Sequence, residues 1–264
     1  MKKELLRKGA IISIATMLIV IVAIPLITGE GNTRIGCYPS SDKITVGEAF
    51  NITFWMSADE SVDSWLIDLL NFNETILGMA NANSVSIDPY WTSGFFENGT
   101  IHNNEGNITG IQAFIMTGST TNTTIFTVNF TAVKPGICHI ILTDAEAYSG
   151  GPNVLYNWYN TSVTIYPEEP TGLTTTTVGQ NRIDLNWTKQ AGMDRTLIRY
   201  KTGSNPINIT DGTELYNDTG ISTSHTGLNP GDTIYYSAWG WNETAVLYSM
   251  NYDTAQGQTS IPLP

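Results

Sequence analysis

Charged residues are scarce in this sequence, and basic ones are the scarcest. Only 14% of the 264 residues are charged, with 12 Lys and Arg against 24 Asp and Glu, for a net charge of −12. Four of the 12 basic residues lie in the first eight positions, so residues 30–264 carry 8 basic and 23 acidic side chains. A surface this acidic repels phosphate, which argues against nucleic acid as a partner.

The signatures of catalysis are also missing. The chain has no Gly-x-Ser-x-Gly, His-Glu-x-x-His, phosphate-loop or Gly-x-Gly-x-x-Gly motif. Two cysteines cannot form a Cys/His metal site with only three scattered histidines, namely His102, His139 and His225. We therefore expect a protein that is not an enzyme and that has no catalytic residue, metal site or cofactor.

The densest acidic groups are Asp59/Glu60/Asp63 and Asp144/Glu146, and both fall in expected loops. Solvated carboxylates are the ordinary state of such loops. Calcium bound by the first group stays open as an alternative, since loop carboxylates are hard oxygen ligands. Its spacing is not that of an EF-hand.

Residues 1–29 join a basic start to an apolar run from Ala10 to Thr28 that only Pro25 interrupts. The run is long enough to span a membrane as a helix. We interpret residues 1–29 as a signal peptide or membrane anchor, which places the protein outside the cell or on its surface. Three alternatives stay open: a cleaved signal, an anchor retained in the membrane through residues 10–28, and pilin-like processing after Gly9.

The pattern of residues 30–167 predicts short strands separated by turns. The stretch Ile44–Trp55 alternates apolar and polar side chains, as a half-buried strand does. We expect nine strands here and no amphipathic helix, which predicts an all-β jelly-roll sandwich. An extra residue near Leu69–Asn71 suggests a β-bulge.

This first region resembles a cohesin module. The phrases that carry the resemblance are Val46-Gly47-Glu48-Ala49-Phe50-Asn51-Ile52, Phe72-Asn73-Glu74-Thr75-Ile76-Leu77, Gly94–Ile101, and Phe130-Thr131-Ala132 with Lys134-Pro135-Gly136. The resemblance implies non-catalytic recognition of a dockerin-like or other cell-surface protein, in a family linked to polysaccharide binding and breakdown. The competing interpretation is a surface-layer, sheath or pilus-like subunit that self-associates.

Residues 168–264 resemble a fibronectin type III domain, an immunoglobulin-like sandwich. The resemblance rests on Pro170–Leu173, Trp187, the strand Thr196–Lys201 and Leu228-Asn229-Pro230-Gly231. It implies a spacer or adhesive role. The family's corner tyrosine is replaced by Ile234, so its hydrogen bond has to be lost or remade by a neighbouring tyrosine.

Cys37 and Cys138 are expected to form a disulfide, because exported proteins usually oxidise a pair of cysteines. Two buried free thiols are the alternative. A side chain at Cys138 that points inward would turn Ile140 and Leu142 inward as well and leave Ile141 outward.

The same alternation in the strand Gly110–Met116 turns Phe114 and Met116 outward. Family resemblance places this strand in one sheet with the strands that start at Val62 and Gly136, and implies that partners bind its outer face. We predict a partner site there, although the loop 144–157 or a second copy of the chain could cover it. The predicted residues are Asp68, Gln112, Phe114, Met116 and Ile141.

The aromatic pairs have two possible interpretations: they are core residues, or they are exposed rings on which sugar rings stack. The pairs are Tyr90-Trp91, Trp158-Tyr159 and Trp239/Trp241.

N-glycosylation acceptor triplets are unusually frequent. Eleven Asn residues stand two positions before Ser or Thr, about twice the number expected by chance for this composition. We expect several to carry glycans in loops or on outward strand positions. They are Asn51, Asn73, Asn98, Asn107, Asn122, Asn129, Asn160, Asn186, Asn208, Asn217 and Asn242.

Overall fold

The structure is a computed structural model that describes residues 33–41, 43–79, 84–119 and 122–263. The regular structure of these described residues is β, apart from short 3-10 turns such as η2 (Trp91–Ser93), which confirms the all-β expectation for them. Within the described residues, no helix is long and apolar enough to cross a membrane. The expected signal or anchor, residues 1–29, lies outside the described residues.

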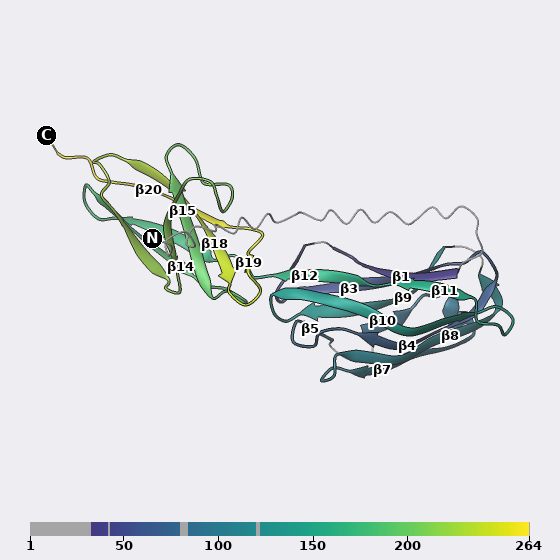
Figure 1. Ribbon diagram of the computed structural model, residues 1–264. Helices are drawn as coiled ribbons and strands as arrows, with labels where there is room; N and C mark the ends of the chain where they lie inside the picture. Colours follow the sequence, from purple (N-terminus) through teal and green to yellow (C-terminus); the bar gives the residue numbers. More distant parts are fainter. Residues whose placement is uncertain (1–32, 42, 80–83, 120–121, 264) are drawn as a thin grey trace, which may run out of the picture.

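The first sandwich is built from strands β1 to β12, which form two sheets (Figure 1). The first sheet has the order β11-β1-β3-β9-β5, and β6 pairs with β9 beside β5. The second sheet has the order β2-β12-β10-β4-β8-β7. The first sheet comprises β1 (Thr33–Pro39), β3 (Ala49–Ser57), β5 (Leu77–Gly78), β6 (Val85–Ile87), β9 (Thr123–Ala132) and β11 (Leu155–Tyr159). The second comprises β2 (Ile44–Thr45), β4 (Val62–Asn71), β7 (Phe95–His102), β8 (Asn107–Ser119), β10 (Gly136–Tyr148) and β12 (Thr161–Tyr166).

The expectation of nine strands was too low. β2 and β5 are only two residues long, and a run that short carries no periodicity to detect. β11 lies directly before β12 and runs parallel to β1, a long-range pairing that the local pattern does not show, so β11 was missed.

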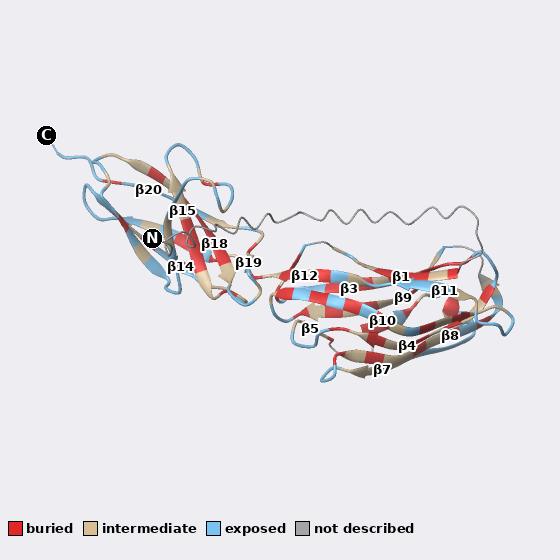
Figure 2. Cartoon of the chain, viewed as in Figure 1, coloured by how far each residue is buried: buried red, intermediate tan, exposed pale blue. Residues whose placement is uncertain are grey.

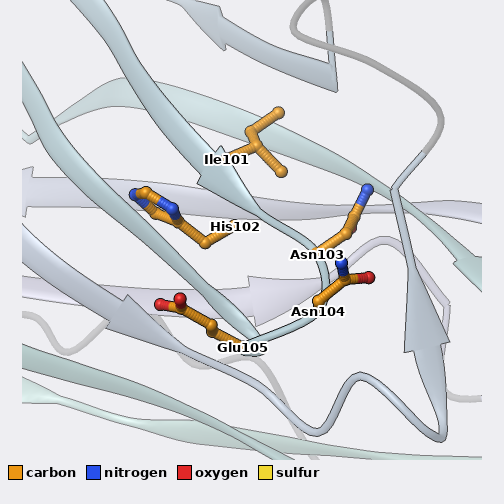
Figure 3. A pocket seen from close by; sticks show the side chains of 5 residues that line it. All are labelled: Ile101, His102, Asn103, Asn104 and Glu105. Atoms are coloured by element: carbon orange, nitrogen blue, oxygen red, sulfur yellow. The ribbon is translucent and has the colours of Figure 1, made fainter.

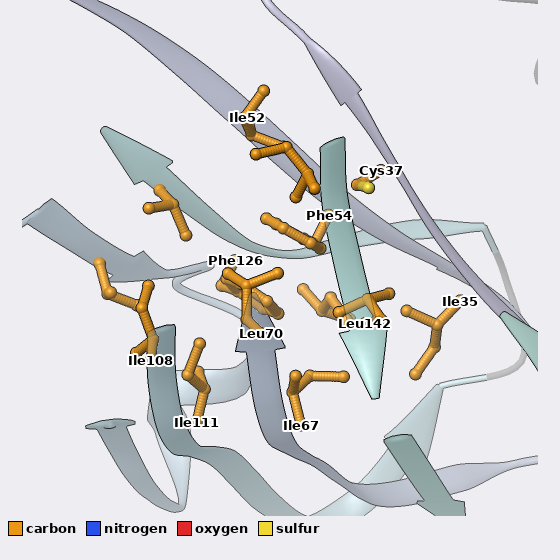
Figure 4. Packing of buried hydrophobic residues seen from close by; sticks show 14 of the residues in the cluster. Ile35, Cys37, Ile52, Phe54, Ile67, Leu70, Ile108, Ile111, Phe126 and Leu142 are labelled. Carbon is orange, nitrogen blue, oxygen red and sulfur yellow. The ribbon is translucent and has the colours of Figure 1, made fainter. Parts of the chain in front are cut away.

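Buried and exposed residues alternate along the strands, as the red and pale blue stripes of Figure 2 show, and the buried side chains of the two sheets pack against each other. Phe54 and Phe126 face each other across β3 and β9 with their rings stacked at 4.2 Å. Figure 4 shows side chains of both sheets, Ile52 and Phe54 from one and Ile67 and Leu70 from the other, gathered in a single core. Burial of this apolar surface is the main source of the sandwich's stability.

Four strands of the second sheet change their inward–outward phase at the same position. On β10 the buried residues on either side of the change are Leu142 and Ala145, and on β8 they are Ile108 and Ile111. The flanking register places Asp144 opposite Asp68, Asp68 opposite Gly110 and Gly110 opposite Gly99. Asp144, Gly110 and Gly99 have φ values of 54°, 69° and 77°. We call these four residues the switch row.

The switch row corrects the expected bulge near Leu69–Asn71. A bulge places two residues of one strand opposite one residue of its partner. Here the register between β4 and both of its neighbours is the same on either side of Asp68. The phase changes in all the strands together, so no strand has an unpaired extra residue at this place.

The two cysteines are free, which corrects the expected disulfide. Cys37 lies on β1 of the first sheet and Cys138 on β10 of the second. The Cys37 thiol donates to the Tyr159 carbonyl at 3.6 Å, and the Cys138 sulfur accepts from the Asn73 amide at 3.1 Å. Each sulfur is thus held by a different neighbour, and facing sheets stand about 10 Å apart, beyond the usual reach of a disulfide.

The second sandwich pairs two smaller sheets around a second hydrophobic cluster that includes Trp187 and Tyr236. One sheet has the order β13-β14-β17, and the other β16-β15-β18-β19, with β20 paired to β18. The strands are β13 (Thr171–Thr177), β14 (Arg182–Thr188), β15 (Arg195–Lys201), β16 (Thr213–Asp218), β17 (Ser222–Thr226), β18 (Thr233–Asn242), β19 (Leu247–Tyr248) and β20 (Asp253–Gln258).

The missing corner tyrosine is replaced from within β18. Ile234 is buried, and Tyr236, two residues on, is fully buried as well. The Tyr236 hydroxyl lies 3.0 Å from Nδ1 of His225 on β17, so the buried phenol is paired with an imidazole of the opposite sheet. Burial raises the pKa of Tyr236 and lowers that of His225, so both groups are neutral at physiological pH.

The two sandwiches touch at Gly192, which lies in the turn between β14 and β15. A Cβ atom at Gly192 would lie 2.7 Å from Cγ of Pro135 and 3.1 Å from Cγ2 of Val46, both in the first sandwich. The neighbouring Ala191 carbonyl accepts from the amide of Glu168 at 3.1 Å. The connecting segment is therefore held against the second sandwich by its backbone.

Candidate functional site

The outer face of the second sheet carries the predicted partner residues. Ile111, Ala113 and Ile115 of β8 are buried, while Phe114 is 46% and Met116 is 92% exposed. β8, β4 and β10 are neighbours in this sheet, as expected. The predicted phase of β8 is therefore confirmed.

Phe114 belongs to an aromatic cluster at one end of this face. Its direct partner across the β7–β8 pair is Phe95, which is 56% exposed. Met116 follows two residues later on the same side of β8. We call the two phenylalanines, Phe95 and Phe114, together with the adjoining apolar side chain of Met116, the aromatic cluster.

Glycine at position 94 allows β7 to approach β8 this closely. A Cβ atom there would lie 2.0 Å from the carbonyl oxygen of Phe114, closer than any side chain can be placed. Phe95 was not among the predicted partner residues, although the apolar run Phe95-Phe96 directly after a glycine was the available signal.

Ile141 does not join that cluster, which corrects the predicted single patch. It is exposed on β10 and stands opposite Asn71 of β4, whereas Phe114 stands opposite Ser64. Ser64 and Asn71 are seven positions apart on β4, a separation of about 23 Å along the strand. The phase of each strand was predictable, but the register that separates Phe114 from Ile141 was not.

An acidic hollow lies between these two ends. It is lined by Leu66, Asp68, Asp144, Ala145, Glu146, Asn153 and Trp158. Asp68 and Asp144 face each other in the switch row, and both are exposed. The Glu146 carboxylate accepts from the Tyr148 hydroxyl, and this hydrogen bond holds the pKa of Tyr148 above its usual range.

Positive charge is absent from the strands of this face. β4, β7, β8 and β10 contain five acidic residues and no Lys or Arg. The ion pairs between described residues all lie in the second sandwich, between Arg182 and Asp184, Arg195 and Glu243, and Lys201 and Asp211. The acids of the hollow therefore have no cation beside them in the described part of the chain.

Gln112 links the two regions. Its Nε2 donates to Oε2 of Glu97 at 2.6 Å, across the β7–β8 pair. On its other side Gln112 stands opposite Leu66, which lines the hollow. Gln112 thus lies between the aromatic cluster and the acidic hollow, as a polar residue at the edge of both.

The aromatic pairs divide between core and surface. Trp91 and Trp239 are buried, and Trp91 packs edge-on against Trp65 at 6.1 Å. Trp158 is 38% exposed at the wall of the acidic hollow. Among these residues, Trp158 combines an exposed ring with a concave, polar surrounding.

A second hollow lies at the β7–β8 turn, where five side chains radiate from the turn (Figure 3). His102 Nε2 lies 3.2 Å from Oγ1 of Thr109, and Asn103 donates to the Met79 carbonyl at 2.9 Å. These polar groups are already bound to the protein. Across the described residues no group of three or more His, Cys, Asp or Glu side chains is placed to hold a metal ion.

No protein-family model and no curated protein matches this sequence. Solved structures do match. The non-cellulosomal cohesin from the hyperthermophilic archaeon Archaeoglobus fulgidus is 16% identical over 51% of this chain and 91% of its own, with a TM-score of 0.43. The Coh-OlpC-Doc435 cohesin–dockerin complex from Clostridium thermocellum matches at 9% identity over 53% of this chain and 97% of its own, with a TM-score of 0.44.

The structure of FN3tt is 18% identical to this chain over 36% of it and 96% of its own length, with a TM-score of 0.30. Both families that the motifs resemble are therefore represented among the matches. The likeness is one of fold at low identity, so the partner has to follow from this chain's own residues.

Proposed function

We propose that this chain is a non-catalytic, cell-surface or extracellular binding protein. Its first sandwich, residues 30–167, would dock a protein partner on the outer face of the second sheet, and residues 168–264 would display it. The observation that carries the proposal is the exposed aromatic cluster of Phe95, Phe114 and Met116 on a regular sheet. Exposed apolar clusters of this kind are typical of interaction sites.

The charge of the face defines the partner's chemistry. Three carboxylates beside the cluster, those of Asp68, Asp144 and Glu146, line a hollow that also contains the Trp158 ring. A Lys or Arg side chain would be attracted by the carboxylates and by the face of the ring. The partner is thus a protein with an apolar anchor next to basic residues, and the cohesin-like motifs favour a dockerin-like one.

The test is capture of partners from surface extracts of the producing cells by the full chain, with Phe114→Asp as the variant. Ile207→Asp is the matched control, because Ile207 is equally apolar, is 66% exposed and lies in the second sandwich. We expect a protein that the wild type and the control retain and that the Phe114 variant loses. The same protein should elute as salt rises, and Asp68→Asn with Asp144→Asn should weaken its retention. A folded Phe114 variant that retains every protein would overturn the proposal.

Self-association is a second candidate, and the free edge of the second sheet favours it. β7 is the outermost strand of that sheet and pairs only with β8 among the described strands. It exposes Phe95 and Phe96 beside unpaired backbone groups. A long apolar edge strand can pair with the same strand of a second copy.

Sedimentation velocity separates the two candidates. Concentration-dependent dimers or filaments that disappear in Phe96→Lys would support a structural subunit. A chain that stays monomeric at all concentrations would exclude the structural subunit, and docking would be the remaining candidate. A polysaccharide ligand of the hollow is tested by tryptophan fluorescence. Sugar that binds there should quench the fluorescence of the wild type, and Trp158→Ala should abolish this quenching.

A further inference from the structure

The structure divides the eleven acceptor asparagines into two groups. Seven have exposed side chains: Asn51, Asn73, Asn122, Asn160, Asn186, Asn208 and Asn217. The other four are only partly accessible: Asn98, Asn107, Asn129 and Asn242. We propose that N-linked glycans occupy sites of the exposed group alone, with Asn73 and Asn208 among them, and that none is attached to the strands of the candidate face.

The reaction sets what each asparagine must offer. Its amide nitrogen Nδ2 forms a bond to the anomeric carbon of a lipid-phosphate-linked oligosaccharide, the co-substrate of a membrane transferase. The bond from that carbon to the phosphate oxygen breaks, the lipid phosphate leaves, and Nδ2 loses one proton to base. In the folded product, Nδ2 has to point to solvent because the attached sugar is larger than the side chain.

Asn73 and Asn208 meet this requirement in the same way. Oδ1 of Asn73 accepts from the backbone amide of Thr75 at 2.9 Å and from its hydroxyl at 2.7 Å. Oδ1 of Asn208 accepts from the amide of Thr210 at 2.9 Å and from its hydroxyl at 2.8 Å. The acceptor threonine thus binds the oxygen of each side chain, and a glycan on the nitrogen would disturb neither hydrogen bond.

Asn98 and Asn107 have the opposite arrangement. The side-chain oxygen of each has no exposed surface. Asn98 also stands opposite Ile111, which is fully buried, so its side chain lies on the inner side of the sheet. Nδ2 of Asn107 donates to Glu105 at 3.4 Å.

Asn242 and Asn129 are held by their own nitrogens. Nδ2 of Asn242 donates to the Gly192 carbonyl at 2.8 Å, close to the contact between the sandwiches, and its Oδ1 accepts from Ala245 at 2.7 Å. Nδ2 of Asn129 donates to Oδ1 of Asn51 at 2.9 Å, directly across β3 and β9. Two glycans on such neighbouring positions would collide, so the exposed Asn51 takes the glycan and Asn129 does not.

The division has a direction in space. The exposed acceptors of the first sandwich lie on β3 of the first sheet and in turns, namely Asn51, Asn73, Asn122 and Asn160. The acceptors on strands of the candidate face are Asn98 on β7 and Asn107 on β8, and both belong to the partly accessible group. No glycan would therefore be attached to β4, β7, β8 or β10, while a glycan on Asn160 would stand beside β10, whose Leu142 amide donates to Oδ1 of Asn160 at 2.8 Å.

The experiment is glycopeptide mass spectrometry on full chain purified from its producing cells. The proposal stands if the occupied sites come only from the exposed group and include Asn73 and Asn208. A glycan on Asn98, Asn107, Asn129 or Asn242, or a bare Asn73 or Asn208, would overturn it.

Matched variants give a second readout on the intact mass. Asn73→Gln should lower the mass by one glycan, whereas Asn98→Gln should leave the glycan mass unchanged. A loss of glycan mass in the Asn98 variant, or none in the Asn73 variant, contradicts the proposal. Both readouts are independent of whether any partner binds.

Discussion

The hydroxyl of Tyr236 and Nδ1 of His225 are 3.0 Å apart inside the second sandwich, and they join its two sheets. The ring of Tyr200 packs on the same imidazole at 4.2 Å between centroids. Buried polar groups that pair with each other are stabilising only while both keep their protonation state. The second sandwich therefore contains a pH-dependent contact between Tyr236 and His225, close to Ile234.

We expect the second sandwich to lose stability in mild acid. Burial lowers the pKa of folded His225 below the ordinary 6.5 that it regains on unfolding. The unfolded chain therefore binds the proton first, and stability that is complete above pH 6.5 is lost as the pH falls towards the folded pKa. Urea unfolding between roughly pH 7.5 and 5 should show a steeper loss for wild type than for His225→Gln, by up to about 1.4 kcal/mol per pH unit. Equal slopes would contradict the expectation.

The two thiols should be unreactive in the folded chain. Burial raises the pKa of Cys37 to about 12 and also raises that of Cys138. Because the thiolate is the nucleophile, iodoacetamide at roughly pH 8 should label neither cysteine in the native protein. Both should be labelled in concentrated guanidinium chloride without reductant. Protein that takes up label only after reduction would show that a disulfide exists.

The switch row gives a test of backbone geometry that is free of packing effects. Gly110 has a φ of 69°, and a Cβ atom there would have no neighbour within 4 Å. Gly110→Val should lower the free energy of unfolding by about 1 to 2 kcal/mol, from the left-handed backbone alone. Met116→Val, an exposed position on the same strand, should change it by less than about 0.5 kcal/mol. Equal effects in urea unfolding would show that Gly110 does not hold this conformation.

The contact between the sandwiches can be tested with two glycines of the same backbone geometry. Gly192 and Gly179 both have a φ of 75°, but only a Cβ at Gly192 would meet another side chain. Gly192→Ala and Gly179→Ala should therefore introduce the same backbone strain. Only Gly192→Ala should also push Pro135 away. We expect faster cleavage by a glutamate-specific protease at Glu168-Glu169 in the Gly192 variant. The same cleavage rate in both variants would mean that the contact does not hold the connection closed.

Local pattern was enough to predict much of the fold. The alternation in Ile44–Trp55 marks β3, and the alternation around Phe114 gives the phase of β8. Both depend on the chain within a few residues, which the sequence contains. The length of β2 and β5 and the parallel pairing of β11 depend on neighbours far along the chain, so they were missed.

The candidate site was predictable only strand by strand. The exposed side chains of Phe114 and Ile141 were predicted, but their separation is set by the pairing of β4 with both β8 and β10. Asp68 meets Asp144 for the same reason, and Trp158 reaches the hollow from a strand of the other sheet. The free thiols show a further limit, since the cellular compartment predicts oxidation but not the positions of two sulfur atoms.

The switch row also restricts how this chain can change over evolution. Deleting one residue from β4 between Trp65 and Leu70 would move one half of that strand out of step while β8 and β10 kept theirs. Apolar side chains of one half would turn to solvent, and no neighbouring strand could compensate alone. Descendants of this chain should therefore keep the lengths of β7, β8, β4 and β10 unchanged and vary in length at the turns. The four residues of the switch row thus fix the alignment of these strands across the sheet.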